Sequence, residues 1–176
     1  MASATLTGIL VHDVMTARPV AVSPTMTIRE LAELLDANEI SGVPVVDGQD
    51  RVIGVVSKTD LLHQWIRGSE VSDGGDYSGA GSFASSGSFI ELLEDGIRAN
   101  EIDRNTDKTI EEFMSVEPVT AHPDESLDVI SRRMVNERVH RVIVVDQDSR
   151  LVGIVTTLDI LDHISDSPKR VSQGKP

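Results

Sequence analysis

Residues 13–62 read DVMTARPVAVSPTMTIRELAELLDANEISGVPVVDGQDRVIGVVSKTDLL, and residues 112–161 read EFMSVEPVTAHPDESLDVISRRMVNERVHRVIVVDQDSRLVGIVTTLDIL. The second stretch repeats the first without a gap, at an offset of 99 residues. Identical residues at matching places include Met15 and Met114, Pro19 and Pro118, Gly54 and Gly153, and Asp60 and Asp159. This duplication predicts two copies packed with pseudo-two-fold symmetry, and a cleft between the copies is the expected ligand site.

The composition narrows the class of protein. The chain has 176 residues, 39% of them hydrophobic, and a formal net charge of −13. Because one repeat is small for an independent domain, we expect the two copies to share a core. The negative charge disfavours binding to a nucleic-acid duplex or an anionic membrane. The absence of cysteine excludes disulfides and thiolate metal sites. No signal peptide or membrane-spanning run is present in the sequence, so we expect a soluble, cytoplasmic protein.

Each copy predicts the order strand, helix, strand, strand, helix. The first copy places strands at 20–22, 43–46 and 51–56, and helices after Thr27 and after Ser57. The second copy places strands at 142–145 and 150–155, a helix capped by Ser126 and a helix after Thr156. Thr27 with Glu30 is typical of a capping box. The short turns between the last two strands predict hairpins. The expected fold class is α/β (α+β), with mixed sheets in two tandem β-α-β-β-α repeats.

Four segments follow from the change in composition along the chain. The first repeat is expected over 8–66 and the second over 108–164, and a short helix is predicted near residues 6–11. Residues 67–107 are predicted to form a Gly/Ser-rich loop followed by a short amphipathic helical insertion. Residues 165–176 are expected to be a polar tail.

One motif occurs at the same place in both copies. It runs from the end of the last strand into the helix as Gly-x-x-Ser/Thr-x-x-Asp, with Ser57 and Asp60 in the first copy and Thr156 and Asp159 in the second. These residues fit a nucleotide site, because a hydroxyl and helix amides can donate to phosphate while the carboxylate accepts from ribose hydroxyls. They fit a helix cap with an acidic third residue equally well. Duplication does not separate the two interpretations, since both duplicate equally.

A second feature favours an anion. Val139, His140 and Arg141 stand just before a buried strand of the second copy, where the first copy has Ile40, Ser41 and Gly42. A histidine and an arginine at a strand start in an acidic protein can hold a phosphate. Alternatively, both side chains are solvated or pair with nearby carboxylates such as Glu137.

Taken together, the sequence resembles a tandem pair of cystathionine-β-synthase-type (CBS) domains, the Bateman module of the stand-alone two-domain type. The matching stretches are Val-Met-Thr at 14–16, Pro-Val at 19–20, Ser-Gly-Val-Pro-Val-Val-Asp at 41–47, Val-His-Arg-Val-Ile-Val-Val-Asp at 139–146 and both Gly-x-x-Ser/Thr-x-x-Asp motifs. The resemblance covers nearly all of 8–66 and 108–164, whereas the long segment between them departs from the family pattern.

The resemblance implies two ligand clefts between the repeats that bind AMP, ADP, ATP or S-adenosylmethionine. It implies a first cleft formed by Ser57, Thr59, Asp60, Val139, His140 and Arg141. It implies a second cleft formed by Thr16, Ile40, Ser41, Thr156 and Asp159. Because the first cleft holds two cations and Leu158 replaces the hydroxyl of Thr59 in the second, we expect the Asp60 cleft to bind nucleotide more tightly.

Two functions are compatible with these features. The first is a regulatory sensor of adenine nucleotides that signals to an unknown effector or through a homodimer, with Leu61, Leu62, Ile160 and Leu161 as candidate dimer contacts if they are not core. The second is a ligand-free interaction scaffold acting through its surface and the 68–106 insertion. We expect no enzyme activity, no catalytic cofactor and no metal, since no nucleophile elbow, P-loop or metal-ligand spacing occurs in the sequence.

Overall fold

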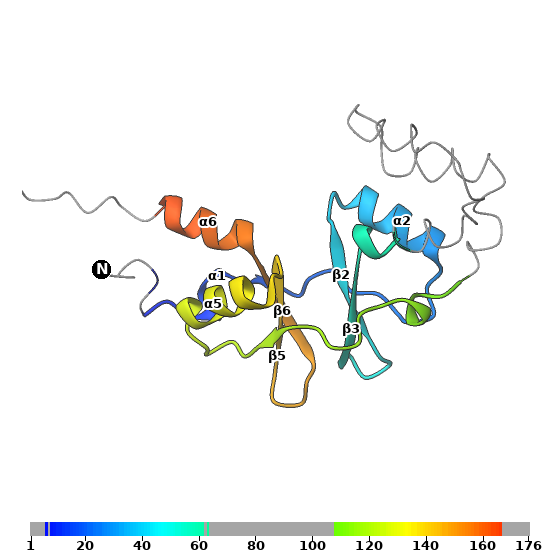
Figure 1. Ribbon diagram of the computed structural model, residues 1–176. Helices are drawn as coiled ribbons and strands as arrows, with labels where there is room; N and C mark the ends of the chain where they lie inside the picture. Colours follow the sequence, from blue (N-terminus) through cyan, green and yellow to red (C-terminus); the bar gives the residue numbers. More distant parts are fainter. Residues whose placement is uncertain (1–5, 7, 62, 64–107, 167–176) are drawn as a thin grey trace, which may run out of the picture. The chain divides into compact units, whose positions relative to one another are not determined.

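The computed structural model describes residue 6, residues 8–61, residue 63 and residues 108–166 (Figure 1). It divides the chain into two compact units. Unit 1 comprises residues 1–19, 50–52 and 118–176, and unit 2 comprises residues 20–49 and 53–117. The predicted Gly/Ser-rich loop, the amphipathic insertion, Leu62 and nearly all of the polar tail lie outside the described residues.

Unit 1 is built on a mixed four-stranded sheet. Its elements are α1 (Val11–Val14), β1 (Thr16–Ala17), β4 (Thr120–Ala121), α5 (Leu127–Glu137), β5 (Arg141–Val145), β6 (Leu151–Thr156) and α6 (Thr157–Asp166). The strand order is β1-β6-β5-β4. β6 runs antiparallel to both β1 and β5, whereas β4 runs parallel to β5. The second repeat has the predicted order along the chain of strand, helix, strand, strand and helix, and β5 and β6 form the predicted hairpin.

Unit 2 contains the corresponding elements of the first repeat. They are α2 (Ile28–Ala37), β2 (Gly42–Val46), most of β3 (Val52–Ser57) and the 3-10 helix η2 (Ile110–Glu112). Residues 58–61 are helical, as predicted after Ser57. β2 and β3 form a two-stranded sheet. The strand predicted at 20–22 is reduced to a single parallel bridge between Val22 and Val45. The fold is thus α+β, with a β-α-β-β-α order in each repeat.

Each unit takes one segment from the start of the other repeat. Thr16, which precedes the first repeat's helix, pairs with Ile154 in unit 1. At the equivalent position 99 residues on, Ser115 bridges Val55 in unit 2 through two backbone hydrogen bonds of 3.0 Å. The compact units therefore differ from the contiguous repeats along the chain.

This exchange corrects the expectation of one shared core. The described residues form two hydrophobic clusters, each within one unit. Val11, fully buried, lies in the cluster built on the second repeat, and Ile110, also fully buried, lies in the cluster built on the first. In each cluster, one buried aliphatic side chain thus comes from the segment that begins the other repeat. The chain therefore packs two small cores instead of one shared core.

The predicted helix caps are partly confirmed. Thr27 and Glu30 form the reciprocal capping box, with the Thr27 amide donating to the Glu30 carboxylate at 2.8 Å. Backbone and hydroxyl hydrogen bonds from Thr27 lower the pKa of Glu30 below its ordinary value. Ser126 occupies the cap position of α5, but its side chain does not cap the helix. Instead, the carbonyl of Ile9 accepts from the first amide of α5, that of Leu127, at 2.9 Å.

The N-terminal helix predicted near residues 6–11 is wrong in its position. The helix α1 begins only at Val11, because Leu10 forms an antiparallel bridge with Ser126. The Leu10 amide donates to the Asp13 carboxylate at 2.9 Å, which fixes the helix start after residue 10.

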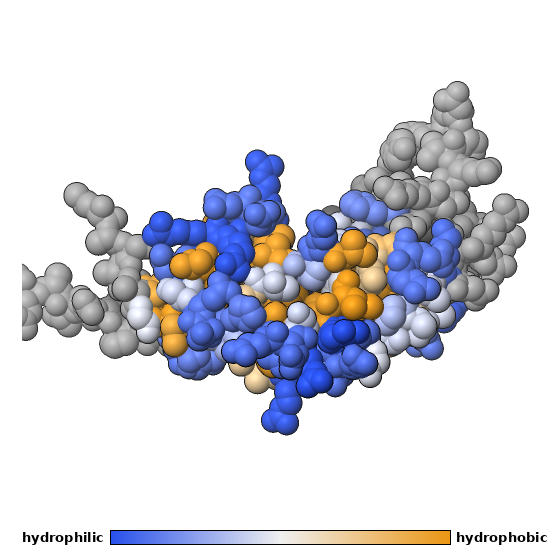
Figure 2. Space-filling model, turned by 90° about the horizontal axis from the view of Figure 1, so that it is seen from below, coloured by the Kyte–Doolittle hydropathy of each residue, from blue (hydrophilic) through white to orange (hydrophobic). Residues whose placement is uncertain are grey.

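The side to which the β5–β6 turn points in Figure 1 carries many hydrophilic side chains (Figure 2).

Candidate functional site

The repeated motif of the first copy forms a helix cap. The Asp60 carboxylate accepts hydrogen bonds from the Ser57 amide at 2.8 Å and from the Ser57 hydroxyl at 2.6 Å. Both bonds end on the same oxygen, Oδ2. No described residue donates to Oδ1 of Asp60. The cap interpretation is therefore confirmed, and it leaves one carboxylate oxygen available to a ligand.

The second copy repeats this geometry. Oδ2 of Asp159 accepts from the Thr156 amide and from the Thr156 hydroxyl, both at 2.6 Å. In the described part of the chain, Oδ1 of Asp159 again has no donor. Thr156 and Asp159 are half-buried, as are Ser57 and Asp60. Partial burial leaves the side chains accessible while it strengthens any hydrogen bond that they make.

The residue before each buried strand lies against the start of the following helix. The Lys58 amide donates to the Ser41 carbonyl at 3.0 Å, and the Thr157 amide donates to the His140 carbonyl at 3.1 Å. The sequence positions singled out before β2 and β5 are thus held next to the motif of their own repeat. In each unit, a strand start, a strand end and a helix start meet at one edge.

Unit 1 brings together candidate residues that the resemblance divides between two clefts. Arg141 pairs with Thr156 across β5 and β6, and Thr16 is the β1 partner of Ile154. His140 lies one residue before Arg141 and is exposed. The unit 1 candidates are Thr16, Val139, His140, Arg141, Thr156 and Asp159. Cations, hydroxyls and a carboxylate therefore occur within this one unit.

Unit 2 brings together the other candidates, which are Ile40, Ser41, Ser57, Thr59 and Asp60. Ile40 is half-buried, whereas Ser41 and Thr59 are exposed. Each predicted cleft draws residues from both units, so both clefts stay predictions. The cation pair at 140–141 belongs to the unit of Asp159 rather than to the unit of Asp60.

The glycine of each motif accommodates the chain itself. A Cβ at Gly153 would lie 2.5 Å from Sδ of Met15 and 3.2 Å from the Thr16 carbonyl oxygen. A Cβ at Gly54 would lie 2.8 Å from Sδ of Met114 and 2.9 Å from the Ser115 carbonyl oxygen. In both motifs, a methionine sulfur and a backbone carbonyl oxygen occupy the space that a side chain at the glycine would need. The two methionines were a missed part of the motif, although their identity in both copies was the signal that could have revealed them.

Comparison with known proteins identifies the family. The family model described as CBS domain matches residues 11–66 and residues 110–166. The chain belongs to the CBS-domain family.

Two curated relatives match most of the chain at modest identity. An uncharacterized protein, MJ1232 of Methanocaldococcus jannaschii, is 30% identical over 90% of this chain and 40% of its own length. The CBS domain-containing protein CBSX1 of Arabidopsis thaliana, which is chloroplastic, is 29% identical over 77% of this chain and 54% of its own length. The chain thus spans about half the length of these curated relatives, or less.

A solved structure shows the same fold. It is the CBS domain pair of protein MJ0100 in complex with 5′-methylthioadenosine and S-adenosyl-L-methionine. The two chains are 26% identical with a TM-score of 0.61, and the match covers 89% of this chain and 95% of the other. This likeness confirms the tandem CBS pair inferred from the sequence.

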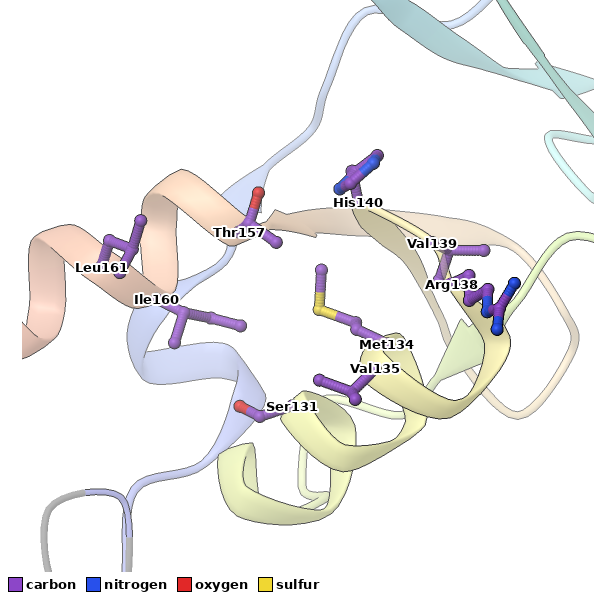
Figure 3. Close-up of a pocket in the computed structure, with 9 residues that line it drawn as sticks. All are labelled: Ser131, Met134, Val135, Arg138, Val139, His140, Thr157, Ile160 and Leu161. Carbon is purple, nitrogen blue, oxygen red and sulfur yellow. The ribbon is translucent and has the colours of Figure 1, made fainter.

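The second CBS repeat carries an apolar pocket of about 520 Å³ between α5 and α6 (Figure 3). Ile160 and Met134 approach each other across it, while Thr157 and His140 lie at one end (Figure 3). The lining residues are Ser131, Met134, Val135, Arg138, Val139, His140, Thr157, Ile160 and Leu161. Val139 and His140 therefore belong both to this pocket and to the predicted ligand residues.

The candidate dimer contacts divide into core and surface. Leu61 is 1% exposed and Ile160 is 8% exposed, so both are core residues. Leu161 is 59% exposed and Val135, across the pocket, is 76% exposed.

Among the described residues, no group of three or more histidine and acidic side chains could hold a metal ion. None of the described helices has the length and apolar character required to cross a bilayer.

Proposed function

We propose that this CBS pair is a regulatory sensor that binds an adenosine-type ligand, AMP, ADP, ATP or S-adenosylmethionine, in clefts between its repeats. The observation that carries the proposal is the duplicated aspartate whose Oδ2 caps a helix while Oδ1 has no described donor. It supports a carboxylate that is already oriented by its own helix before a ligand arrives.

An oriented carboxylate suits ribose. Two vicinal hydroxyls can donate to a carboxylate, the interaction that positions ribose in dinucleotide-binding folds. The cap holds the side chain in one conformation, so less conformational entropy is lost on binding. The exposed His140 and the half-buried Arg141 belong to the predicted Asp60 cleft, where they offer donors to a phosphate or to another anionic group.

The likeness to MJ0100 supports the adenosine class, because both molecules in that complex contain adenosine. Regulation by such a ligand requires unequal affinity for two conformations of the module or of its assembly. The proposal assigns no catalysis, no catalytic cofactor and no metal to the chain, and a cytoplasmic location remains a prediction.

Isothermal titration with AMP, ATP and S-adenosylmethionine tests the proposal. Asp60→Asn and Asp159→Asn are the informative variants, because an amide oxygen can still cap the helix while the other carboxylate oxygen becomes a donor. We expect each substitution to weaken or remove one binding event, with Asp60→Asn weakening the tighter one. Equal losses from the two variants would contradict the predicted difference between the clefts, and unchanged affinity in both would contradict the ribose role.

A second candidate function, binding of a protein partner or of a second copy, is favoured by the exposed apolar side chains at the pocket. Val135 and Leu161 flank it, and Leu158 and Ile164 continue the apolar surface along α6 with 73% and 39% exposure. An apolar groove between two helices suits an amphipathic helix. A homodimer that uses this surface is the simplest form, and the 68–106 insertion is the other predicted interaction element.

Light scattering separates this second candidate from the sensor proposal. We expect Leu161→Glu to shift a dimer toward monomer while nucleotide affinity is retained. Val129→Glu is the matched control, because Val129 is 47% exposed on the same unit but does not line the pocket. A monomeric wild-type protein, or a dimer insensitive to Leu161→Glu, would contradict a homodimer through this surface.

A further inference from the structure

Exposed apolar side chains gather on the outer face of α5 and α6 in unit 1. Among the residues that the structure describes, seven large hydrophobic side chains are exposed, and four of them lie on these two helices around the pocket. We call this surface the α5–α6 face, and its members are Val135 on α5 and Leu158, Leu161 and Ile164 on α6. The three α6 residues are spaced by three positions, so they lie along one side of the helix. A contiguous apolar surface of this kind marks an interaction site.

A groove adjoins this row of apolar side chains. It is the pocket of about 520 Å³ between α5 and α6 (Figure 3). Its buried lining includes Met134 and Ile160, which are 3% and 8% exposed, and its exposed lining includes Val135 and Leu161 from opposite helices. Leu161 is therefore both a wall of the groove and a projecting member of the α6 row. A groove of this size admits an aliphatic side chain, to which the flexible Met134 can adjust.

The first repeat is more polar at two of the four matching positions. At the offset of 99 residues, Asp36 stands where the second repeat has Val135, and Thr59 stands where it has Leu158. Glu39 adds an exposed carboxylate just after α2. A carboxylate placed against an apolar groove loses its water without gaining a hydrogen bond, which costs free energy. The α5–α6 face is therefore a better partner for the same face of another copy than for the first repeat.

Charges at the margin of the face also suit contact between two copies. Arg138 lines the pocket and Asp162 follows Leu161 on α6, and both are exposed. Neither side chain forms a hydrogen bond or an ion pair with another described residue. Because the face carries charges of both signs, two copies related by a two-fold axis can place opposite charges across the contact. A face with charges of one sign would instead repel its own copy.

We propose that the α5–α6 face of one copy docks on the α5–α6 face of a second copy about a two-fold axis. This inference rests on the second candidate function above and names the surface that covers the pocket. Leu161 of each copy enters the groove of the other, where it lies between the partner's Val135 and the partner's Leu161. Such an isologous contact fills both grooves at once and closes at two copies. The dimer is thus built from the second repeat alone.

Disulfide cross-linking of the full chain tests this arrangement, and the chain has no cysteine of its own to interfere. Because Leu161 lies beside the partner's Leu161 in the proposed dimer, we expect Leu161→Cys to form a covalent dimer with itself under mild oxidation. Val135→Cys mixed with Leu161→Cys should also give the mixed dimer. Val129→Cys is the matched control, because Val129 is 47% exposed on the same unit but does not line the pocket. It should remain a monomer in denaturing electrophoresis without reductant.

The first repeat supplies the competing arrangement. Glu39→Cys mixed with Leu161→Cys should give no cross-link, and a cross-link between these two in place of the Leu161→Cys dimer would overturn the inference. A dimer that Leu161→Glu dissociates, but that Leu161→Cys does not cross-link, would also overturn it while the second candidate function stands. A monomeric wild-type protein contradicts both.

Light scattering of the wild-type protein at rising salt concentration adds a readout that needs no substitution. The net charge of −13 makes two copies repel each other, and salt screens that repulsion. We expect salt to tighten a dimer whose contact is apolar. A dimer that weakens as salt rises would be held by ion pairs, which would overturn docking through the apolar groove.

Discussion

The contact between each motif glycine and its methionine gives a quantitative prediction for alanine substitution. At Gly54, the added Cβ meets both a flexible sulfur at 2.8 Å and the Ser115 carbonyl oxygen at 2.9 Å. The Ser115 backbone bridges Val55 and cannot shift without breaking those bonds. We expect Gly54→Ala to lower the free energy of unfolding by about 1–3 kcal/mol, the usual cost of overpacking.

At Gly153 the obstruction differs in kind. The nearest atom is Sδ of Met15 at 2.5 Å, the far end of a flexible side chain, whereas the Thr16 carbonyl oxygen lies at a tight but tolerable 3.2 Å. Rotation of Met15 can relieve most of the clash, so we expect a cost below about 1 kcal/mol. Shortening the methionine should therefore rescue Gly153→Ala but not Gly54→Ala, because only the latter has a backbone obstruction.

Urea unfolding of the full chain measures both effects. Gly48→Ala is the control, since a Cβ there meets nothing within 4 Å and should change stability by less than about 1 kcal/mol, in the stabilising direction. Double-mutant cycles of Gly153→Ala with Met15→Ala and of Gly54→Ala with Met114→Ala isolate the pairwise term. The reasoning is refuted if Gly54→Ala is as stable as Gly48→Ala, or if Met114→Ala rescues Gly54→Ala fully.

Three further predictions concern caps, turns and acid. Ser57→Ala and Thr156→Ala should each lower the free energy of unfolding by about 1 kcal/mol in urea melts, because both hydroxyls complete a cap, and an unchanged midpoint would contradict the cap geometry. Ser149 and Asp50 both have a φ of 62°, a region in which glycine is not strained and which aspartate tolerates better than serine. Ser149→Gly should therefore raise the free energy of unfolding by about 0.5–1 kcal/mol, and Asp50→Gly should raise it by less. Thermal melts, with Asp148→Gly as the control, check this order. Because the pKa of Glu30 is lowered on folding, its carboxylate stabilises the fold above its ordinary pKa of 4.5, and this stabilisation is lost as the pH falls through the folded-state pKa. The stability advantage of the wild-type protein over Glu30→Gln should therefore disappear in acid. A stability difference that does not change with pH would contradict this role of Glu30.

The local structure was predictable because short-range patterns determine it. Thr27 with Glu30, and each hydroxyl with the aspartate three residues on, satisfy backbone amides within one helical turn. The hairpins followed from turn residues between aliphatic strands. These interactions act within a few residues, so the sequence displays them directly.

The long-range arrangement was not predictable from one sequence. Val11 and Ile110 fit equally well in the core of either unit, because aliphatic patterns do not specify which copy a strand or helix joins. The cap of α5 by a backbone carbonyl, in place of the Ser126 side chain, depends on the same exchange of segments. The grouping of His140 and Arg141 with Thr156 also required strand register, which the sequence does not encode locally.

The most direct test of the sensor proposal compares AMP with its 2′,3′-dideoxy analogue by isothermal titration on the wild-type protein. If Oδ1 of Asp60 and of Asp159 accepts hydrogen bonds from ribose hydroxyls, AMP binds, and loss of both hydroxyls weakens its binding at least tenfold, about 1.4 kcal/mol. Equal affinity for the two compounds, or no heat from either at millimolar concentration, would contradict it.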